Sequence, residues 1–167
     1  MTPSNNDTDY QNAKYLVDAL ANQSISSVEL VQSTIDRITV LDDKINAVVV
    51  RDFERALEAA KIADKAIAQK KRLPLLGLPI TVKESFNIVG LTTTWGNSHY
   101  KDWKPEEDAL AVSRLKAAGV IIIGKTNVPL MLKDWQTYND IYGTTNNPWN
   151  LKLTPGGSSG GSAAALA

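Results

Sequence analysis

The stretch that decides the fold lies near the end of the sequence and reads Thr154-Pro155-Gly156-Gly157-Ser158-Ser159-Gly160-Gly161-Ser162-Ala163-Ala164-Ala165. It places four glycines and three serines within seven residues and then changes to alanines. Glycine permits tight turns and close backbone approach, and alanine is the strongest helix former. The pattern predicts a tight loop that enters a buried helix, with N–H groups and hydroxyls available to an anion or oxyanion. A flexible Gly/Ser linker is the alternative, which the alanine run disfavours.

Composition excludes several functions for this chain of 167 residues. Lys+Arg and Asp+Glu are equal at 18 each, so net charge attracts neither nucleic acid nor an anionic membrane. The absence of cysteine excludes a thiol nucleophile, a cysteine-ligated metal and a disulfide scaffold. The polar start has no signal-peptide pattern and no apolar run reaches membrane-spanning length, so we expect a soluble, cytoplasmic protein. His99, the only histidine, lies in a polar loop and is not expected to form a catalytic triad.

The first half of the chain predicts three helices and one strand. Apolar spacing indicates a helix over 10–21, and the capping box formed by Ser26 and Glu29 opens a second helix that runs to about residue 41. Residues 46–50 are short, apolar and β-branched, which predicts a buried strand, and residues 53–70 form an external amphipathic helix. The inward-facing residues of the first two helices are Leu16, Val17, Leu20, Val28, Val31, Ile35 and Ile38.

The second half changes in character. A turn leads into a strand at residues 79–83, a helix follows over 107–118, and Gly119 ends that helix before another buried strand at 120–123. This order is a βαβ crossover and predicts parallel strands. Three helix residues are expected to face inward, namely Ala111, Leu115 and Ala118. The later aromatic residues (Trp135, Tyr138, Tyr142 and Trp149) are expected to pack a long ordered loop, because the segment lacks the basic residues of a nucleotide-stacking surface.

Residues 119–126 read G-V-I-I-I-G-K-T and match the pattern of a phosphate-binding P-loop. A P-loop requires a strand before the first glycine, a loop between the glycines and a helix after the Lys-Thr pair. Here a predicted helix comes before the first glycine, the intervening residues are β-branched and apolar, and Pro129 disfavours a following helix. Nucleotide binding is therefore the weaker interpretation of this segment.

Lys83 is the stronger candidate for a catalytic lysine. It ends an apolar strand, and the carboxyl ends of strands line the ligand crevice in α/β sheets. Burial lowers the pKa of a lysine and turns its amine into a usable base, which can activate a serine without histidine. A lysine that only ends the strand, or that pairs with Glu84, remains an equal alternative from this residue alone.

Four blocks of sequence occur in order: Gly77-Leu78-Pro79-Ile80-Thr81-Val82-Lys83, then Ala118-Gly119 with Gly124-Lys125-Thr126-Asn127, then Asn147-Pro148-Trp149, then residues 155–163 of the glycine–serine stretch. Together they resemble the amidase signature family, and the helical start is similar to the family's amino end. The resemblance implies an α/β fold with a central, mixed, mostly parallel sheet flanked by helices. It implies one incomplete amidase domain over 1–167, with a helical region at 1–72 and the start of the α/β core at 73–167.

The family hydrolyses or transfers amide C–N bonds with a Ser–cis-Ser–Lys triad. The resemblance therefore implies that Lys83 is the catalytic lysine and Ser158 the cis-serine that relays protons to the nucleophile. Ser159 would hold the loop by hydrogen bonds. The supporting loop comprises Gly156, Gly157, Ser159, Gly160 and Gly161. The resemblance implies no cofactor and no metal.

One element of the family pattern is missing from these residues. The family's nucleophilic serine lies in a second Gly-Gly-Ser segment beyond this block, with the oxyanion donors near it. In this sequence that segment would come after Ala167, so we expect the nucleophile beyond Ala167 and expect residues 1–167 alone to be inactive. A non-catalytic amidase remnant is the alternative to a piece of an enzyme.

The resemblance also bears on the substrate. Residues 128–132 read V-P-L-M-L where the amidotransferase that makes Gln-tRNA carries an acidic pair in its amidase-like subunit. This favours a general small-molecule amidase, with the amidotransferase reaction on glutamine and tRNA as the alternative. We expect a small-molecule amide as the substrate. We expect no nucleic acid and no membrane as partners, and assembly into a homo-oligomer is possible under this interpretation.

Overall fold

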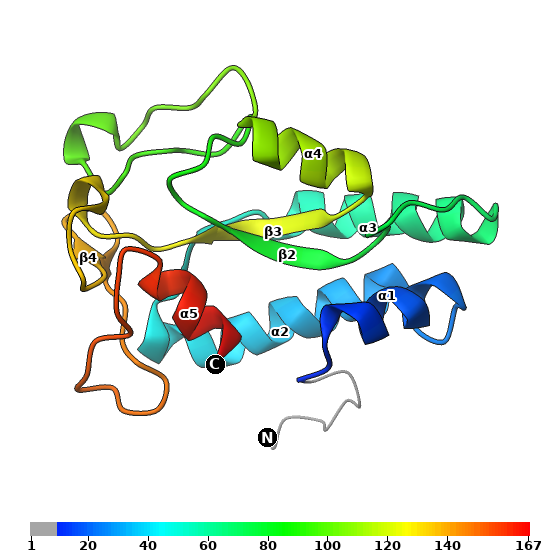
Figure 1. Cartoon of the computed structure of the whole chain (residues 1–167), viewed down its shortest axis with the longest axis horizontal. Helices are drawn as coiled ribbons and strands as arrows, with labels where there is room; N and C mark the ends of the chain where they lie inside the picture. Colours follow the sequence, from blue (N-terminus) through cyan, green and yellow to red (C-terminus); the bar gives the residue numbers. More distant parts are fainter. Residues whose placement is uncertain (1–9) are drawn as a thin grey trace.

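The computed structural model describes residues 10–167 (Figure 1), and its first two helices begin at side-chain caps. Asn12 accepts a hydrogen bond from the Tyr15 amide at the start of the first helix, and Ser26 and Glu29 form the predicted capping box at the second. The α-helices are α1 (Ala13–Ala21), α2 (Ser27–Ile45), α3 (Phe53–Ala68), α4 (Leu110–Ala118) and α5 (Gly160–Leu166). The strands are β1 (Val48–Arg51), β2 (Pro79–Lys83), β3 (Ile121–Thr126), β4 (Tyr138–Asn139) and β5 (Gly143–Thr144).

The central sheet has the order β1-β3-β2. Strands β2 and β3 are parallel, which confirms the prediction from the βαβ pattern, whereas β1 runs antiparallel to β3. The sheet is therefore mixed, as the family resemblance implies. Strand β3 is buried along its whole length, so the segment that matches a P-loop contains a strand where that motif needs a loop.

Helices cover both faces of the sheet. Ile121 and Ile123 of β3 pack against α2 and α3, including Ile35. Ile122 and Val82 point to the other face and pack against Val112 of α4. Figure 1 shows α4 on one side of β3 and α2 on the other. This two-sided cover is what strands without hydrophobic alternation require.

The prediction for the inward face of α4 was wrong in part. Ala111 is exposed, and Val112 is the buried residue of this helix. Burying valine removes more apolar surface from water than burying alanine, so Val112 determines which side of α4 faces the sheet. Gly119 ends α4 with φ of 98°, a left-handed conformation that glycine adopts without steric cost.

A β-bulge interrupts the pairing of β2 with β3. Ile80 pairs with Ile122 and Thr81 pairs with Gly124, so Ile123 is the extra residue. Such a bulge reverses the alternation of side chains along the strand that carries it. Residues of β3 after Ile123 therefore point to the opposite face from the one that simple alternation predicts.

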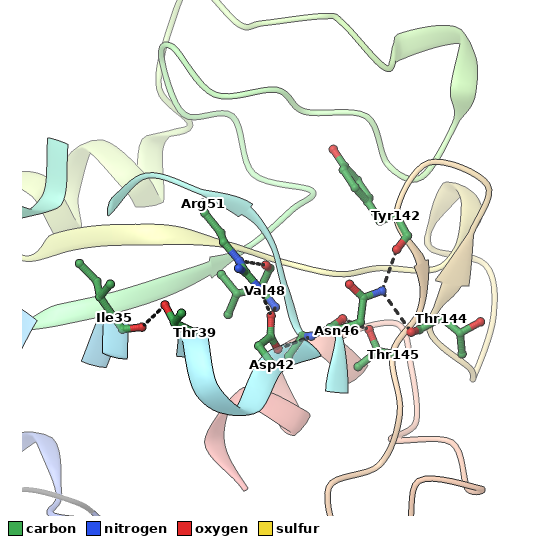
Figure 2. A network of polar contacts seen from close by, with 10 residues as sticks. Ile35, Thr39, Asp42, Asn46, Val48, Arg51, Tyr142, Thr144 and Thr145 are labelled. Atoms are coloured by element: carbon green, nitrogen blue, oxygen red, sulfur yellow. Dashed lines mark hydrogen bonds and ion pairs between the residues drawn. The ribbon is translucent and has the colours of Figure 1, made fainter. Parts of the chain in front are cut away.

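The end of α2 is tied to the β4–β5 hairpin through side chains (Figure 2). Asp42 accepts hydrogen bonds from the amides of Ala47 (2.7 Å) and Val48 (3.1 Å). Asn46 donates to the carbonyl oxygens of Tyr142 and Thr144. Asn46 has φ of 57°, a left-handed conformation that asparagine tolerates. These bonds fix the hairpin next to the start of β1.

The aromatic side chains of the later loop do not all pack. Trp135, Tyr138 and Trp149 are 85%, 48% and 86% exposed, so the prediction that they pack within the loop is wrong for all three. Tyr142 is partly buried, and its hydroxyl lies 3.4 Å from the carboxylate of Glu84. The Trp149 amide donates to Asn147 Oδ1, which forms a local turn just before the exposed indole.

Candidate active site

Lys83 and Ser158 meet although 75 residues separate them in the sequence. Lys83 is the last residue of β2, and its Nζ donates to Ser158 Oγ over 2.7 Å. Both residues are partly buried, and the peptide bond between Gly157 and Ser158 is cis. Burial lowers the pKa of the Lys83 amine below its ordinary value. The structure thus joins a lysine with a lowered pKa to a serine hydroxyl.

Glu84 does not pair with Lys83, although the two are adjacent in sequence. Its side chain is fully buried and accepts hydrogen bonds from the backbone amides of Thr94 and Trp95. Within residues 10–167, Lys83 takes part in no ion pair. The alternative in which Glu84 neutralises Lys83 is therefore wrong.

A second lysine, Lys125, lies in β3 and is completely buried. Its Nζ donates to the carbonyl oxygen of Thr92 and to Thr93 Oγ1. Burial lowers its pKa from 10.5 to about 8, and the nearby Glu84 carboxylate partly opposes this shift. Sequence reasoning considered Glu84 only as a partner of Lys83, and Lys125 only as part of the P-loop match and of a family block. The sequence signal for Lys125 was its position in an otherwise apolar strand, where its side chain would be buried. Lysine is almost never fully buried unless it has a partner, so this position indicated a polar contact.

The glycines of the loop allow it to pack directly on neighbouring backbone. A Cβ on Gly157 would lie 2.5 Å from the Asp134 carbonyl oxygen, and one on Gly161 would lie 2.7 Å from the Asn127 carbonyl oxygen. A Cβ on Gly160 would collide with the Thr137 side chain. Gly156 has φ of 89°, which favours glycine. The loop therefore contains glycine at these positions because its backbone packs closely against the residues after β3 and before β4.

Further side-chain bonds attach the loop at both ends. Thr137 Oγ1 donates to the Gly156 carbonyl oxygen over 2.8 Å. Thr126 Oγ1 and Ser162 Oγ lie 2.7 Å apart. Ser159 is exposed, and its carbonyl oxygen accepts from the Ala163 amide at the start of α5. Among residues 10–167 the Ser159 hydroxyl has no hydrogen-bond partner, so Ser159 supports the loop here through its backbone.

Ala167 directly follows α5. Its amide donates to the Ala163 carbonyl oxygen over 3.2 Å, so the helix continues in regular form to this point. Within residues 10–167, the hydroxyl that contacts Lys83 Nζ is that of Ser158. The nucleophilic serine that we expect beyond Ala167 lies outside these residues and stays a prediction.

A shallow cavity of about 290 Å³ is formed by the segment between β3 and β4. Its lining combines apolar and charged residues and comprises Pro129, Leu130, Met131, Lys133, Asp134 and Tyr138. The Asp134 carbonyl oxygen also faces Gly157. The cavity therefore adjoins the backbone that carries Ser158.

Three further observations concern metal binding, His99 and membrane spanning within residues 10–167. Residues 10–167 contain no group of acidic or histidine side chains that could hold a metal ion. His99 is exposed, and its ring contacts Tyr100 edge-to-face at 5.0 Å. None of the helices within 10–167 is long and apolar enough to cross a bilayer.

The family model for amidases matches residues 29–167. The chain is similar to the A subunit of glutamyl-tRNA(Gln) amidotransferase from Mycolicibacterium paratuberculosis, with 41% identity over 93% of this chain and 32% of that protein. Among solved structures, a bacterial aryl acylamidase of the amidase signature family has 30% identity and a TM-score of 0.89, covering 95% of this chain and 34% of that one.

An inhibitor-bound protein from a "vestigial protein complex", described in connection with the origin of an s-triazine catabolic enzyme, is also similar. It has 35% identity and a TM-score of 0.89, and the match covers 94% of this chain and 35% of that chain. The chain thus spans about a third of the length of its relatives. Since the family model covers more than half of the sequence and the fold agrees, the chain belongs to the amidase signature family.

Proposed function

We propose that this chain supplies the lysine and the relay serine of an enzyme that hydrolyses carboxamide C–N bonds. The observation that carries the proposal is the 2.7 Å contact from Lys83 Nζ to Ser158 Oγ. Its surroundings support a base, because burial lowers the pKa of Lys83 and no carboxylate within residues 10–167 neutralises it. The proposal takes residues 1–167 as the amino-terminal part of an amidase domain, with 1–72 mainly helical and 73–167 beginning the core.

The proposed reaction begins with a neutral Lys83 amine. Lys83 accepts the proton of Ser158, and Ser158 in turn takes the proton of a nucleophilic serine that lies beyond Ala167. That serine attacks the amide carbon, and the proton returns through the same relay to the departing amine. Water then releases the acid from the acyl-enzyme by the same steps. The backbone of the glycine–serine loop holds Ser158 in place, and we expect residues 1–167 alone to lack turnover.

The test uses the complete gene product and a chromogenic amide. Lys83→Ala and Ser158→Ala should each lower kcat by about 10²- to 10⁴-fold, because each breaks the proton relay. Lys61→Ala is the matched control, since Lys61 lies exposed on α3 and pairs there with Glu58. Near-parental turnover of Lys83→Ala, with the fold intact by circular dichroism, would refute the assignment of the base.

A second candidate is the amidotransferase reaction, in which glutamine is the amide and a tRNA-bound product is made. The 41% identity to a curated amidotransferase favours it. The apolar segment 128–132, which forms part of the cavity, favours a general amidase. Ammonia release from glutamine, compared with release from simple aliphatic and aryl amides, separates the two. A preference for glutamine of more than about tenfold in kcat/KM would overturn the general-amidase proposal.

The remaining properties follow from this proposal. The substrate is a small-molecule amide, the protein acts in the cytoplasm, and nucleic acid and membrane are not partners of the general amidase. A non-catalytic remnant of the family is the competing outcome. Turnover by the complete gene product that depends on Lys83 would exclude that outcome.

A further inference from the structure

Two hydroxyl groups join the end of β3 to the start of α5 beside the lysine–serine contact. Thr126 Oγ1 and Ser162 Oγ lie 2.7 Å apart. Thr126 is the last residue of β3, and it pairs with Lys83, the last residue of β2. The ends of β2 and β3 are therefore both bonded to one segment of the chain. Lys83 at the end of β2 contacts Ser158, and Thr126 at the end of β3 contacts Ser162, four residues later in the sequence.

The bulge at Ile123 gives Thr126 this direction. In a strand without a bulge, Thr126 would share a face with Ile122, because side chains alternate with a period of two. Ile122 points toward α4. With the bulge, Thr126 points instead toward α5, and it is completely buried there. The bulge at Ile123 thus brings the Thr126 hydroxyl to the glycine–serine loop.

Packing around the pair leaves α5 little freedom to shift sideways. Gly161 lies directly against the backbone of Asn127, with no room for a Cβ. Ala164 packs against Ala47 and Val48 at the start of β1. These contacts are apolar or steric and leave rotation about the helix axis possible. The Thr126–Ser162 hydrogen bond is directional, so it opposes that rotation.

We infer that Thr126 and Ser162 are positioning residues that hold Ser158 within hydrogen-bonding distance of Lys83. The inference rests on the proposed function, because it concerns the same proton relay. Neither residue exchanges a proton with substrate in this scheme. Each acts through α5, whose first turn begins two residues after Ser158.

The experiment compares four variants of the complete gene product. Thr126→Val removes the hydroxyl with little change in shape, and Ser162→Ala removes the second hydroxyl while favouring the helix. Each should lower kcat by about 10- to 100-fold with KM changed less than about twofold, since displacement of a reacting group by about 1 Å has such an effect. The double variant should be no slower than the slower single variant. Thr126→Ser, which restores the hydroxyl, should recover most of the loss.

A second readout does not require turnover. The rate at which a small acylating reagent labels Lys83, followed by mass spectrometry against pH, reports the pKa of its amine. In Thr126→Val and Ser162→Ala this pKa should rise toward the ordinary lysine value, because a displaced loop admits water. Thr34→Val is the control, since the Thr34 hydroxyl bonds within α2, to the Leu30 carbonyl oxygen. It should leave both kcat and the labelling profile of Lys83 unchanged.

The outcomes separate this inference from the proposed function. If Lys83→Ala keeps its turnover but Thr126→Val shifts the labelling profile, the catalytic assignment fails and the positioning role stands. If both Thr126→Val and Ser162→Ala keep parental labelling and kcat within about twofold, the positioning role is refuted. Ser162→Ala decides the question if Thr126→Val does not fold. A loss of equal size in Thr34→Val would also refute the role, because it would reflect general destabilisation.

Discussion

Adding one methyl group at Gly161 tests how closely α5 must approach the end of β3. Alanine is a better helix former than glycine by about 1 kcal/mol, so propensity alone predicts that Gly161→Ala stabilises the protein. The structure predicts the reverse. A Cβ at this position would lie 2.7 Å from the Asn127 carbonyl oxygen and 3.0 Å from its Cα, and closer still to its amide nitrogen.

The size of the effect follows from these distances. Relief of the clash requires α5 to move by about 1 Å, and such overpacking costs about 1–3 kcal/mol. After subtraction of the propensity gain, we expect a net loss of about 0–2 kcal/mol in the free energy of unfolding, so that Gly161→Ala does not stabilise the protein. The same shift would lengthen the Lys83–Ser158 contact from 2.7 Å to about 3.7 Å, beyond hydrogen-bonding distance. Turnover should therefore fall by about 100-fold.

Urea unfolding of the complete gene product measures the first effect, and amide hydrolysis measures the second. Ala165→Gly is the control, because Ala165 is exposed on the same helix and its replacement changes propensity without a steric clash. It should cost up to about 1 kcal/mol and leave turnover within about twofold. If Gly161→Ala proves more stable than the parent and equally active, the close approach of α5 to Asn127 is not required and the reasoning is refuted.

Three further predictions concern the fold. Lys125 has its pKa lowered by burial from 10.5 to about 8, so the folded state binds fewer protons than the unfolded state between these values. The parent should therefore gain about 2–3 kcal/mol of stability relative to Lys125→Met as pH rises from 8 to 10.5, and a difference that does not vary with pH would contradict this. Asp42→Ala should cost about 2–3 kcal/mol in urea unfolding because it leaves two buried amides without an acceptor, while Asp42→Asn should recover part; equal losses would argue against this. Ser26→Ala removes the capping box and should lower stability by about 1 kcal/mol, with no effect on the labelling of Lys83.

Much of the fold could be predicted because its signals are local or periodic. The capping box at Ser26 starts α2 as expected, and Gly119 ends α4. The parallel pairing of β2 with β3 follows from the handedness and short connections of βαβ units. The approach of Lys83 to Ser158 could be anticipated only from the family resemblance, since nothing in the intervening residues encodes that distance.

The remainder depends on features that have no period in the sequence. The bulge at Ile123 occurs within an unbroken run of apolar β-branched residues, which looks the same with or without an inserted residue. The burial of Glu84 depends on how the loop around Thr94 folds over it. Trp149 is exposed and follows a side-chain turn at Asn147, and the tendency of tryptophan to be buried carries no information about such a turn.

The bulge also separates two positive charges. In a regular register Lys83 would stand directly opposite Lys125 on one face of the sheet, about 5 Å away. Two ammonium groups at that distance repel by about 3 kcal/mol at an effective dielectric constant of about 20. With Ile123 inserted, Lys125 pairs with Val82, and the two amines lie on opposite faces. Burial lowers the pKa of each lysine, but the two amines have different partners: Lys83 bonds to Ser158, and Lys125 bonds to Thr92 and Thr93.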